Sequence, residues 1–125
     1  MQTSSKIKWL IAYGLLFAAN SFAQPAYQWA SSIGGTGIDN GQRIAVDGSE
    51  NSYVTGSFRG TVDFDPSGGT ANLISAGGAD IFVAKYDVNG AYQWAFRIGG
   101  VPDDLGYNIA VDNSGNCYIT GYLGG

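Results

Sequence analysis

Oxygen-bearing side chains recur at alternating positions in one short segment near the C-terminus. Asp112, Ser114 and Asn116 stand two residues apart, which is the spacing of oxygen ligands at the start of a calcium-binding loop. The match to an EF-hand fails later, because Cys117 stands where that loop needs glycine and Leu123 where it needs glutamate. A turn held by its own side chains needs the same residue types. We favour the turn and keep a weak calcium site as the alternative.

Two other pairs of acidic residues have a spacing that could serve chemistry. Asp63 and Asp65 share a face of an extended chain, so they could offer two oxygens to calcium or cap the turn that begins at Pro66. Asp103 and Asp104 are adjacent and point apart in an extended chain, which makes them a poor pair for general acid and base roles. We again favour turn roles over a metal.

The composition removes most catalytic mechanisms from consideration. The 125 residues include no histidine, so the usual general base, zinc ligand and imidazole triads are missing from the sequence. The single cysteine, Cys117, matches Ser52 in an earlier repeat and is interpreted as a small, partly buried residue. No glycine-rich phosphate loop with a lysine occurs. The sequence therefore predicts a protein that is not an enzyme, with no catalytic residue and no cofactor assigned.

An internal repeat dominates the chain. Residues 27–60 align without a gap with residues 92–125, 65 positions later, and 19 of the 34 aligned positions are identical. Identical segments include Tyr-Gln-Trp-Ala, Ile-Gly-Gly and Ala-Val-Asp. A repeat of this kind is typical of repeat architectures, which are scaffolds more often than catalysts. We assign repeat units to about 27–91 and 92–125, the second one truncated.

The periodicity after residue 23 is that of strands, and no segment there predicts a helix. Asn89-Gly90 marks a hairpin turn, because only residues that tolerate a positive φ fill such turns easily. A stretch that includes Thr61, Pro66 and Ser75 is interpreted as an inserted, weaker hairpin. The expected strands are residues 27–33, 43–46, 52–58, 81–86, 92–98, 108–111 and 117–122.

These elements predict an all-β protein and, more narrowly, a partial β-propeller of antiparallel four-stranded blades. Subtracting the inserted hairpin from the 65-residue period leaves about the 40 to 45 residues of a propeller blade. Each blade then buries its faces on the next. Solenoid stacking is the alternative. Because a closed propeller has about four to eight blades, we expect the remaining blades in a longer chain or, less favoured, in an oligomer of this one.

The motif Asp-x-x-Gly-Asn-x-Tyr-x-Thr-Gly is complete at residues 112–121 and lacks only its first glycine at 47–56, where Glu50 stands. With this motif the chain resembles the bacterial β-propeller repeat proteins known as SBBP repeats, in the long Phe-Asp-Pro variant found in secreted proteins of Bacteroidetes. The resemblance implies a propeller fold and leaves the function open. Glu50 suggests a locally altered turn in the first copy.

The N-terminus predicts export. Lys6 and Lys8 precede an apolar run, and Ser21-Phe22-Ala23 provides the small residues of a cleavage site, so residues 1–23 are interpreted as a signal peptide. The run is short for a membrane span, and we expect none after cleavage. Without the two leader lysines, four basic residues face ten acidic ones, a net charge of about −6, which disfavours nucleic acid as a partner. The expected location is extracellular or at the cell surface, with the periplasm as an alternative.

Aromatic residues offer a binding role or a packing role. Trp29 and Trp94, with Tyr27 and Tyr92, could stack on sugar rings, but their recurrence at one position per unit is more typical of packing between sheets. Three hypotheses remain: a secreted non-enzymatic scaffold that binds an unknown protein or glycan, with adhesion as one such role; part of an exported carbohydrate-active enzyme; and a calcium-stabilised structural spacer.

Overall fold

The computed structural model describes residue 26 and residues 28–125, and the predicted signal peptide lies outside this part. The described part is all-β and its strands pair antiparallel, which confirms the predicted fold class. Among these residues no helix is long and apolar enough to cross a membrane. The strands are β1 (Gly34–Gly35), β2 (Asn40–Val46), β3 (Ser52–Phe58), β4 (Thr61–Asp63), β5 (Asn72–Ile74), β6 (Asp80–Tyr86), β7 (Tyr92–Ile98), β8 (Leu105–Val111) and β9 (Cys117–Tyr122).

Four of the strands form one propeller-type blade. They pair in the order β2-β3-β6-β7, with short turns after β2 and β6 and the inserted segment between β3 and β6. Gly90 in the turn between β6 and β7 has a φ of 79°, as the Asn-Gly signal predicts. The central strands β3 and β6 are almost wholly buried, whereas β2 and β7 at the edges are more exposed. The blade is therefore complete in itself.

The inserted hairpin predicted from the sequence is present. β4 pairs with β5, and β1 joins them as a third short strand. This hairpin covers one face of the blade with a core that contains Phe58, Phe64 and Phe82, whose rings meet at angles from 47° to 88°. Such tilted and edge-to-face contacts are favourable for aromatic rings. The hairpin therefore closes one half of this face.

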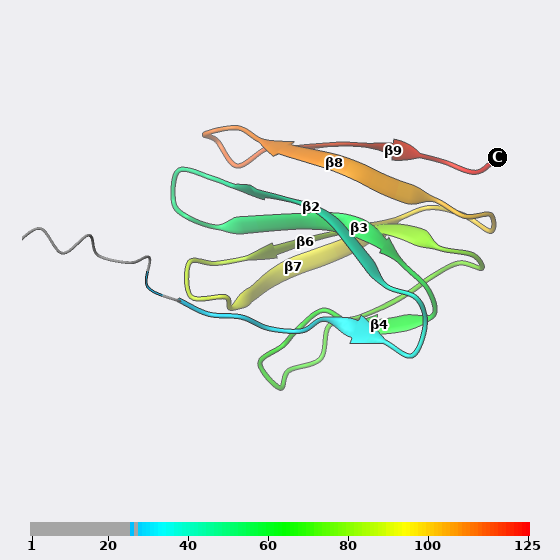
Figure 1. Cartoon of the computed structure of the whole chain (residues 1–125), viewed down its shortest axis with the longest axis horizontal. Helices are drawn as coiled ribbons and strands as arrows, with labels where there is room; N and C mark the ends of the chain where they lie inside the picture. The colour runs from blue at the N-terminus through cyan, green and yellow to red at the C-terminus, as the bar shows by residue number, and fades with distance from the viewer. Residues whose placement is uncertain (1–25, 27) are drawn as a thin grey trace, which may run out of the picture.

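Strands β8 and β9 form a two-stranded sheet that packs against the other face of the blade, and Figure 1 shows it above β2 and β3, with the hairpin containing β4 below. Its core contains Tyr53, Val83 and Ile109, exposed by 0%, 0% and 6% respectively. Cys117 is half-buried beside this core, as expected for a small packing residue. In the repeat alignment β8 and β9 correspond to β2 and β3, so they are the first two strands of a second blade.

One predicted strand is wrong. Residues 28–33 form no strand, and only Gly34–Gly35 pairs with a neighbour, while Tyr27 lies outside the described residues. The counterpart in the second copy is β7, which needs β6 as its partner. Among the described residues no strand stands in the corresponding position beside this segment, so it has no partner of that kind to pair with. It packs through Trp29 and Ile33 against the first core instead.

Candidate functional site

The calcium candidate near the C-terminus is a turn between β8 and β9. The Asp112 carboxylate accepts hydrogen bonds from the backbone N–H groups of Ser114 and Asn116, both at 2.9 Å, and from the Asn116 side-chain amide at 2.8 Å. Tyr118 donates a longer bond at 3.4 Å. These bonds, with that from the Asn116 side chain as the largest cause, lower the pKa of Asp112. Hydrogen-bond donors therefore already surround the Asp112 carboxylate, which a calcium ion would need as a ligand.

The first copy builds the same turn. Asp47 accepts bonds from the backbone of Ser49 and Asn51 and from the side chains of Asn51 and Tyr53. The Asn51 side chain is the main cause that lowers the pKa of Asp47 to about 2. Glu50 has a φ of 63°, close to the 80° of Gly115 in the second copy. The expectation of an altered turn is wrong, because the Asp47 network holds the glutamate in the left-handed region.

The second calcium candidate lies in the inserted hairpin. Asp63 accepts bonds from the backbone N–H groups of Asp65 and Ala71, and Asp65 accepts bonds from the backbone and hydroxyl of Ser67. The Ser67 hydroxyl is the first cause that lowers the pKa of Asp65. The two carboxylates hold separate parts of one turn. Across the described residues no three His, Cys, Asp or Glu side chains gather as a metal site would require, and calcium binding stays a prediction.

The tryptophans pack in the two cores. Trp29 lies in the first core and donates from Nε1 to the carbonyl oxygen of Val88 at 3.1 Å. Trp94 meets Tyr53 edge to face, with ring centroids 5.9 Å apart, and stacks on Phe96 at 5.3 Å. The packing interpretation of both tryptophans is confirmed. Phe96 remains 41% exposed, at the margin of this aromatic group.

Two carboxylates at the junction between the blades are buried, and the sequence predicted this burial for neither of them. Asp80, at the start of β6, is fully buried, and its Oδ2 accepts bonds from Arg97 and from the backbone of Ala76. Asp104, 1% exposed, accepts bonds from the backbone N–H groups of Gly100 and Gly124 at 2.7 and 2.9 Å. Neither carboxylate is open to a substrate. They fix the connection from β7 to β8 against β6.

Asp104 before β8 has a counterpart before β2, Asp39. The aligned repeat copies therefore contained a signal for this buried position. Asp39 accepts a 2.7 Å bond from the backbone of Gly35, as Asp104 does from Gly100. The other oxygen of Asp39, Oδ1, is buried and has no hydrogen-bond partner among the described residues. Asp103 has different partners: its carboxylate accepts hydrogen bonds from the backbone N–H of Ala79 and from the guanidinium of Arg59. The adjacent pair Asp103 and Asp104 therefore has divided structural roles, as its spacing indicates.

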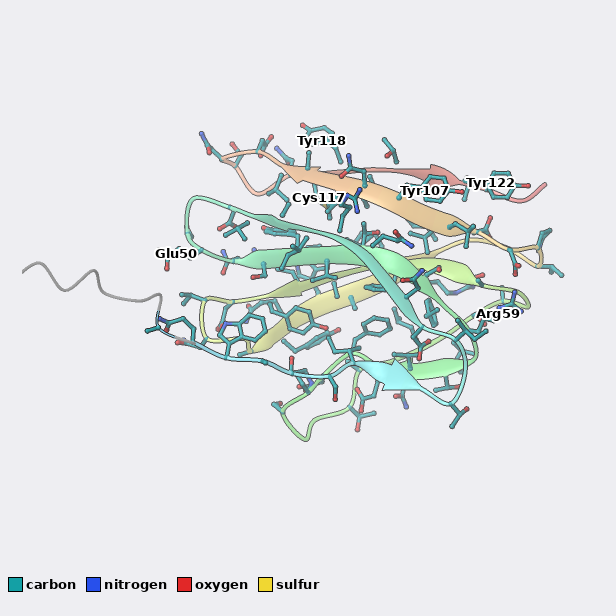
Figure 2. The ribbon with its side chains drawn as sticks, viewed as in Figure 1. Glu50, Arg59, Tyr107, Cys117, Tyr118 and Tyr122 are labelled. Atoms are coloured by element: carbon teal, nitrogen blue, oxygen red, sulfur yellow. The ribbon has the colours of Figure 1, made fainter. Side chains whose placement is uncertain are left out.

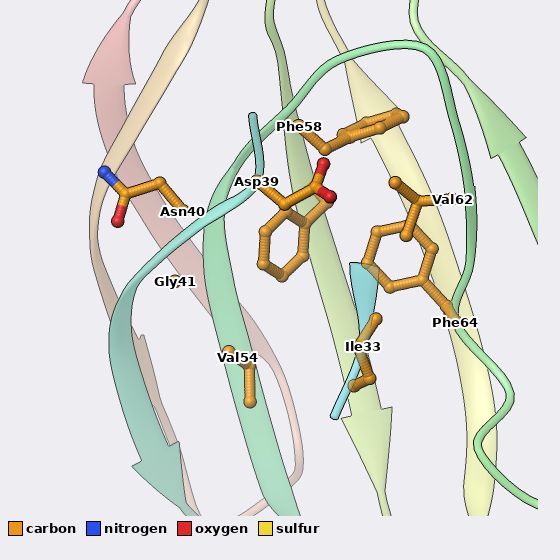
Figure 3. A pocket seen from close by; sticks show the side chains of 9 residues that line it. Ile33, Asp39, Asn40, Gly41, Val54, Phe58, Val62 and Phe64 are labelled. Carbon is orange, nitrogen blue, oxygen red and sulfur yellow. The ribbon is translucent and has the colours of Figure 1, made fainter. Parts of the chain in front are cut away.

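A cavity of about 150 Å³ opens beside Asp39 (Figure 3). Its wall is mostly apolar, and the carboxylate of Asp39 is directed toward the rings of Phe58 and Phe64. The cavity lies beside the first residues of β2. It belongs to the face of the blade that the inserted hairpin only half closes. Its lining residues are Ile33, Asp39, Asn40, Gly41, Val54, Phe58, Val62, Phe64 and Phe82.

The β-propeller repeat model for the SBBP family matches residues 28–57 and 93–122. The chain carries two SBBP β-propeller repeats. These SBBP repeats contain both Asp-centred turns, and their spacing agrees with the sequence repeat. Propeller repeats of this kind suggest a repeat scaffold or a binding module.

Two curated proteins resemble the SBBP repeats of this chain. An uncharacterized WD repeat-containing protein of Acanthamoeba polyphaga mimivirus is 30% identical over 110 residues, which covers 77% of this chain and 8% of that protein. The regulatory protein FlaEY of Caulobacter vibrioides is 32% identical over 93 residues, which covers 74% of this chain and 10% of that protein. The chain thus spans a tenth or less of the length of these relatives. No solved structure gives a significant match.

Proposed function

We propose that this chain is an exported, non-enzymatic propeller module that serves as a binding or structural scaffold at the cell surface, with adhesion as one such role. One observation carries the proposal: each repeat uses its acidic side chains to hold turns and blade junctions. Asp47 and Asp112 do so with the same set of bonds. The relatives' names, a WD repeat-containing protein and a regulatory protein, support a binding role. Its partner is a protein or a glycan.

Export and surface location are tested together on the native product. Intact mass spectrometry of the exported protein should give a product that begins at Gln24, and labelling of intact cells with an antibody to the repeats should reach it. A product that keeps residues 1–23 and resists labelling until the cells are opened would overturn the exported part of the proposal. In that case, pull-down of the purified repeats with defined glycans and proteins would test only a scaffold that stays inside the cell.

A carbohydrate-active enzyme is the second hypothesis, and its test is direct. The buried acids Asp80 and Asp104 give it no support, because a glycosidase needs two carboxylates that reach the substrate. We expect no hydrolysis of chromogenic glycosides by the purified chain. Hydrolysis that Asp103→Asn or Asp63→Asn abolishes would establish the enzyme instead of the scaffold.

A calcium-stabilised spacer is the third hypothesis. A ligand that binds only the folded state raises the melting temperature, and the rise grows with the logarithm of the ligand concentration above the dissociation constant. We expect the melting temperature to be the same in calcium and in EDTA, because hydrogen-bond donors already surround Asp112. A rise in calcium that Asp112→Asn removes, while Asp87→Asn in the turn before β7 leaves it intact, would support the spacer.

A further inference from the structure

Two buried carboxylate oxygens converge on one spot at the blade junction. Asp80 has no exposed surface and Asp104 is 1% exposed. A Cβ added to Gly99 would lie 3.0 Å from Oδ1 of Asp80 and closer still to Oδ2 of Asp104. Both oxygens therefore flank the Cα of the same glycine, and a residue with a side chain would leave no room for them.

One of these oxygens lacks a partner. Oδ1 of Asp80 is buried and has no hydrogen-bond partner among the described residues. Oδ2 of Asp80 accepts bonds from Arg97 and from the backbone of Ala76, and both oxygens of Asp104 accept bonds from backbone N–H groups. An oxygen of an ionised group that is buried without a partner is costly. Oδ1 of Asp80 therefore needs a donor or a positive charge.

The charges at the junction do not balance either. Asp80 and Asp104 bring two negative charges, and among the described residues Arg97 is the one cation that pairs with either of them. The neighbouring pair of Asp103 and Arg59 is neutral in sum and about half exposed, and Figure 2 shows Arg59 at the outer margin of the molecule. One negative charge thus remains buried, and a buried charge is normally paired or bound to a metal ion.

We propose that a monovalent cation of the size of sodium binds between Oδ1 of Asp80 and Oδ2 of Asp104. One positive charge balances the junction, whereas a divalent ion leaves an excess. Sodium is about as large as calcium, whose bonds to oxygen are about 2.3 to 2.6 Å long, so one ion can reach both oxygens.

Few acidic ligands are needed for such an ion. The described residues contain no group of three His, Cys, Asp or Glu side chains that could hold a metal ion. A single positive charge requires fewer carboxylates than calcium does, and carbonyl and water oxygens supply the other ligands of a hard cation. Two carboxylates with one unbalanced charge therefore suit a monovalent ion.

An ion at this position ties the two blades together. Asp80 is the first residue of β6, Arg97 lies in β7, and Asp104 stands just before β8. Because only the folded chain brings the two acids to one spot, the ion stabilises the folded state by mass action. This role goes beyond the scaffold function proposed above and does not depend on export or on a partner.

Thermal denaturation in two chloride salts tests the proposal with the chain that begins at Gln24, which retains every described residue. Tetramethylammonium is too large for the site, so it serves as the reference cation at the same ionic strength. In sodium chloride the folding equilibrium constant should be about fivefold higher, which raises the melting temperature by about 4 to 8 °C in a domain of this size. Broadening of the sodium-23 resonance by the folded chain gives binding directly.

Variants locate the ion. Asp80→Asn and Asp104→Asn should each abolish the sodium effect, because each removes the unbalanced charge, and circular dichroism checks that they fold. Asp103→Asn is the matched control: this neighbouring acid is half exposed and pairs with Arg59, so the sodium effect should persist.

Three results would overturn the proposal. Equal melting temperatures in the two salts would do so in the unaltered chain alone, even where a variant fails to fold. If stability ignored sodium but rose as the pH was lowered, a proton would take the place of the ion. A sodium effect that survives in both Asp80→Asn and Asp104→Asn would place the ion elsewhere.

Discussion

Replacing Arg97 by methionine tests how the buried acid at the blade junction is held. Asp80 has no exposed surface, and its only charged partner in the described structure is the guanidinium of Arg97, whose side chain is 37% exposed. Removing one partner of a buried ion pair costs about 3 to 5 kcal/mol, because the remaining charge is left without compensation. Since Arg97 reaches partly into solvent, we expect the lower end, about 3 kcal/mol.

The chain has its own matched control. Arg59 pairs with Asp103 at 2.7 Å, but the two side chains are 45% and 49% exposed. Exposed ion pairs contribute about 0 to 1 kcal/mol, so Arg59→Met should cost less than about 1 kcal/mol. Both changes remove the same guanidinium and leave the same aliphatic stem. The difference between the two losses in free energy of unfolding therefore measures the effect of burying the acidic partner.

Urea denaturation of the chain from Gln24 gives the free energies of unfolding, provided that the slope with urea is unchanged. The double variant Arg97→Met with Asp80→Asn should recover at least half of the loss, because the amide removes the uncompensated charge and still accepts from the Ala76 backbone. If Arg97→Met cost no more than Arg59→Met, the reasoning would be refuted. A double variant as unstable as the single one would also refute it, since lost packing and not charge would then explain the effect.

Three further predictions concern the turns and the glycine contacts. The pKa of Asp47 is lowered to about 2, so its turn stabilises the fold above about pH 4 and loses this contribution as the pH falls toward 2. The melting temperature should therefore fall less over this pH range in the Asp47→Asn variant than in the unaltered chain. Glu50→Gly should raise the free energy of unfolding by about 1 kcal/mol in urea denaturation, since glycine adopts the left-handed conformation without strain; no gain would contradict this. Gly106→Ala should cost about 1 to 3 kcal/mol by the same assay and Gly41→Ala under about 0.5 kcal/mol, because a Cβ added to Gly106 would lie 2.9 Å from the carbonyl oxygen of Gly56 and one added to Gly41 would meet nothing within 4 Å; equal costs would contradict this.

The strands that were predicted to the residue are those whose neighbours lie in the chain and whose sequence alternates clearly. β3, β7 and β9 begin and end where the pattern indicates. β2 and β8 begin three residues earlier than expected, because each has glycine as its second residue and a shift in its pairing there, at Gly41 and at Gly106. A local pattern does not register such a bulge, since the extra residue interrupts the alternation.

The site shows the same division between local and long-range information. The roles of Asp112 and Asp63 in turns follow from bonds to residues that are close in sequence, so spacing alone predicted them. The junction acids need partners from distant segments: Asp80 is held by Arg97, 17 residues away, and Asp104 by Gly124, 20 residues away. The repeat nevertheless offered a signal, because Asp39 and Asp104 occupy the same position in both copies.

The sequence repeat and the blade differ in phase, and this explains why the units interlock. The second sequence unit begins with β7, but β7 completes the sheet formed by β2, β3 and β6 of the first unit. Each unit therefore contributes its first strand to the preceding blade and its next two strands, β8 and β9 here, to a new blade. Asp104, just before β8, donates its backbone N–H to the carbonyl oxygen of Ala79, just before β6, which ties the new blade to the old one beside the covalent connection. Successive units of this kind therefore interlock, because each one completes the sheet of the unit before it.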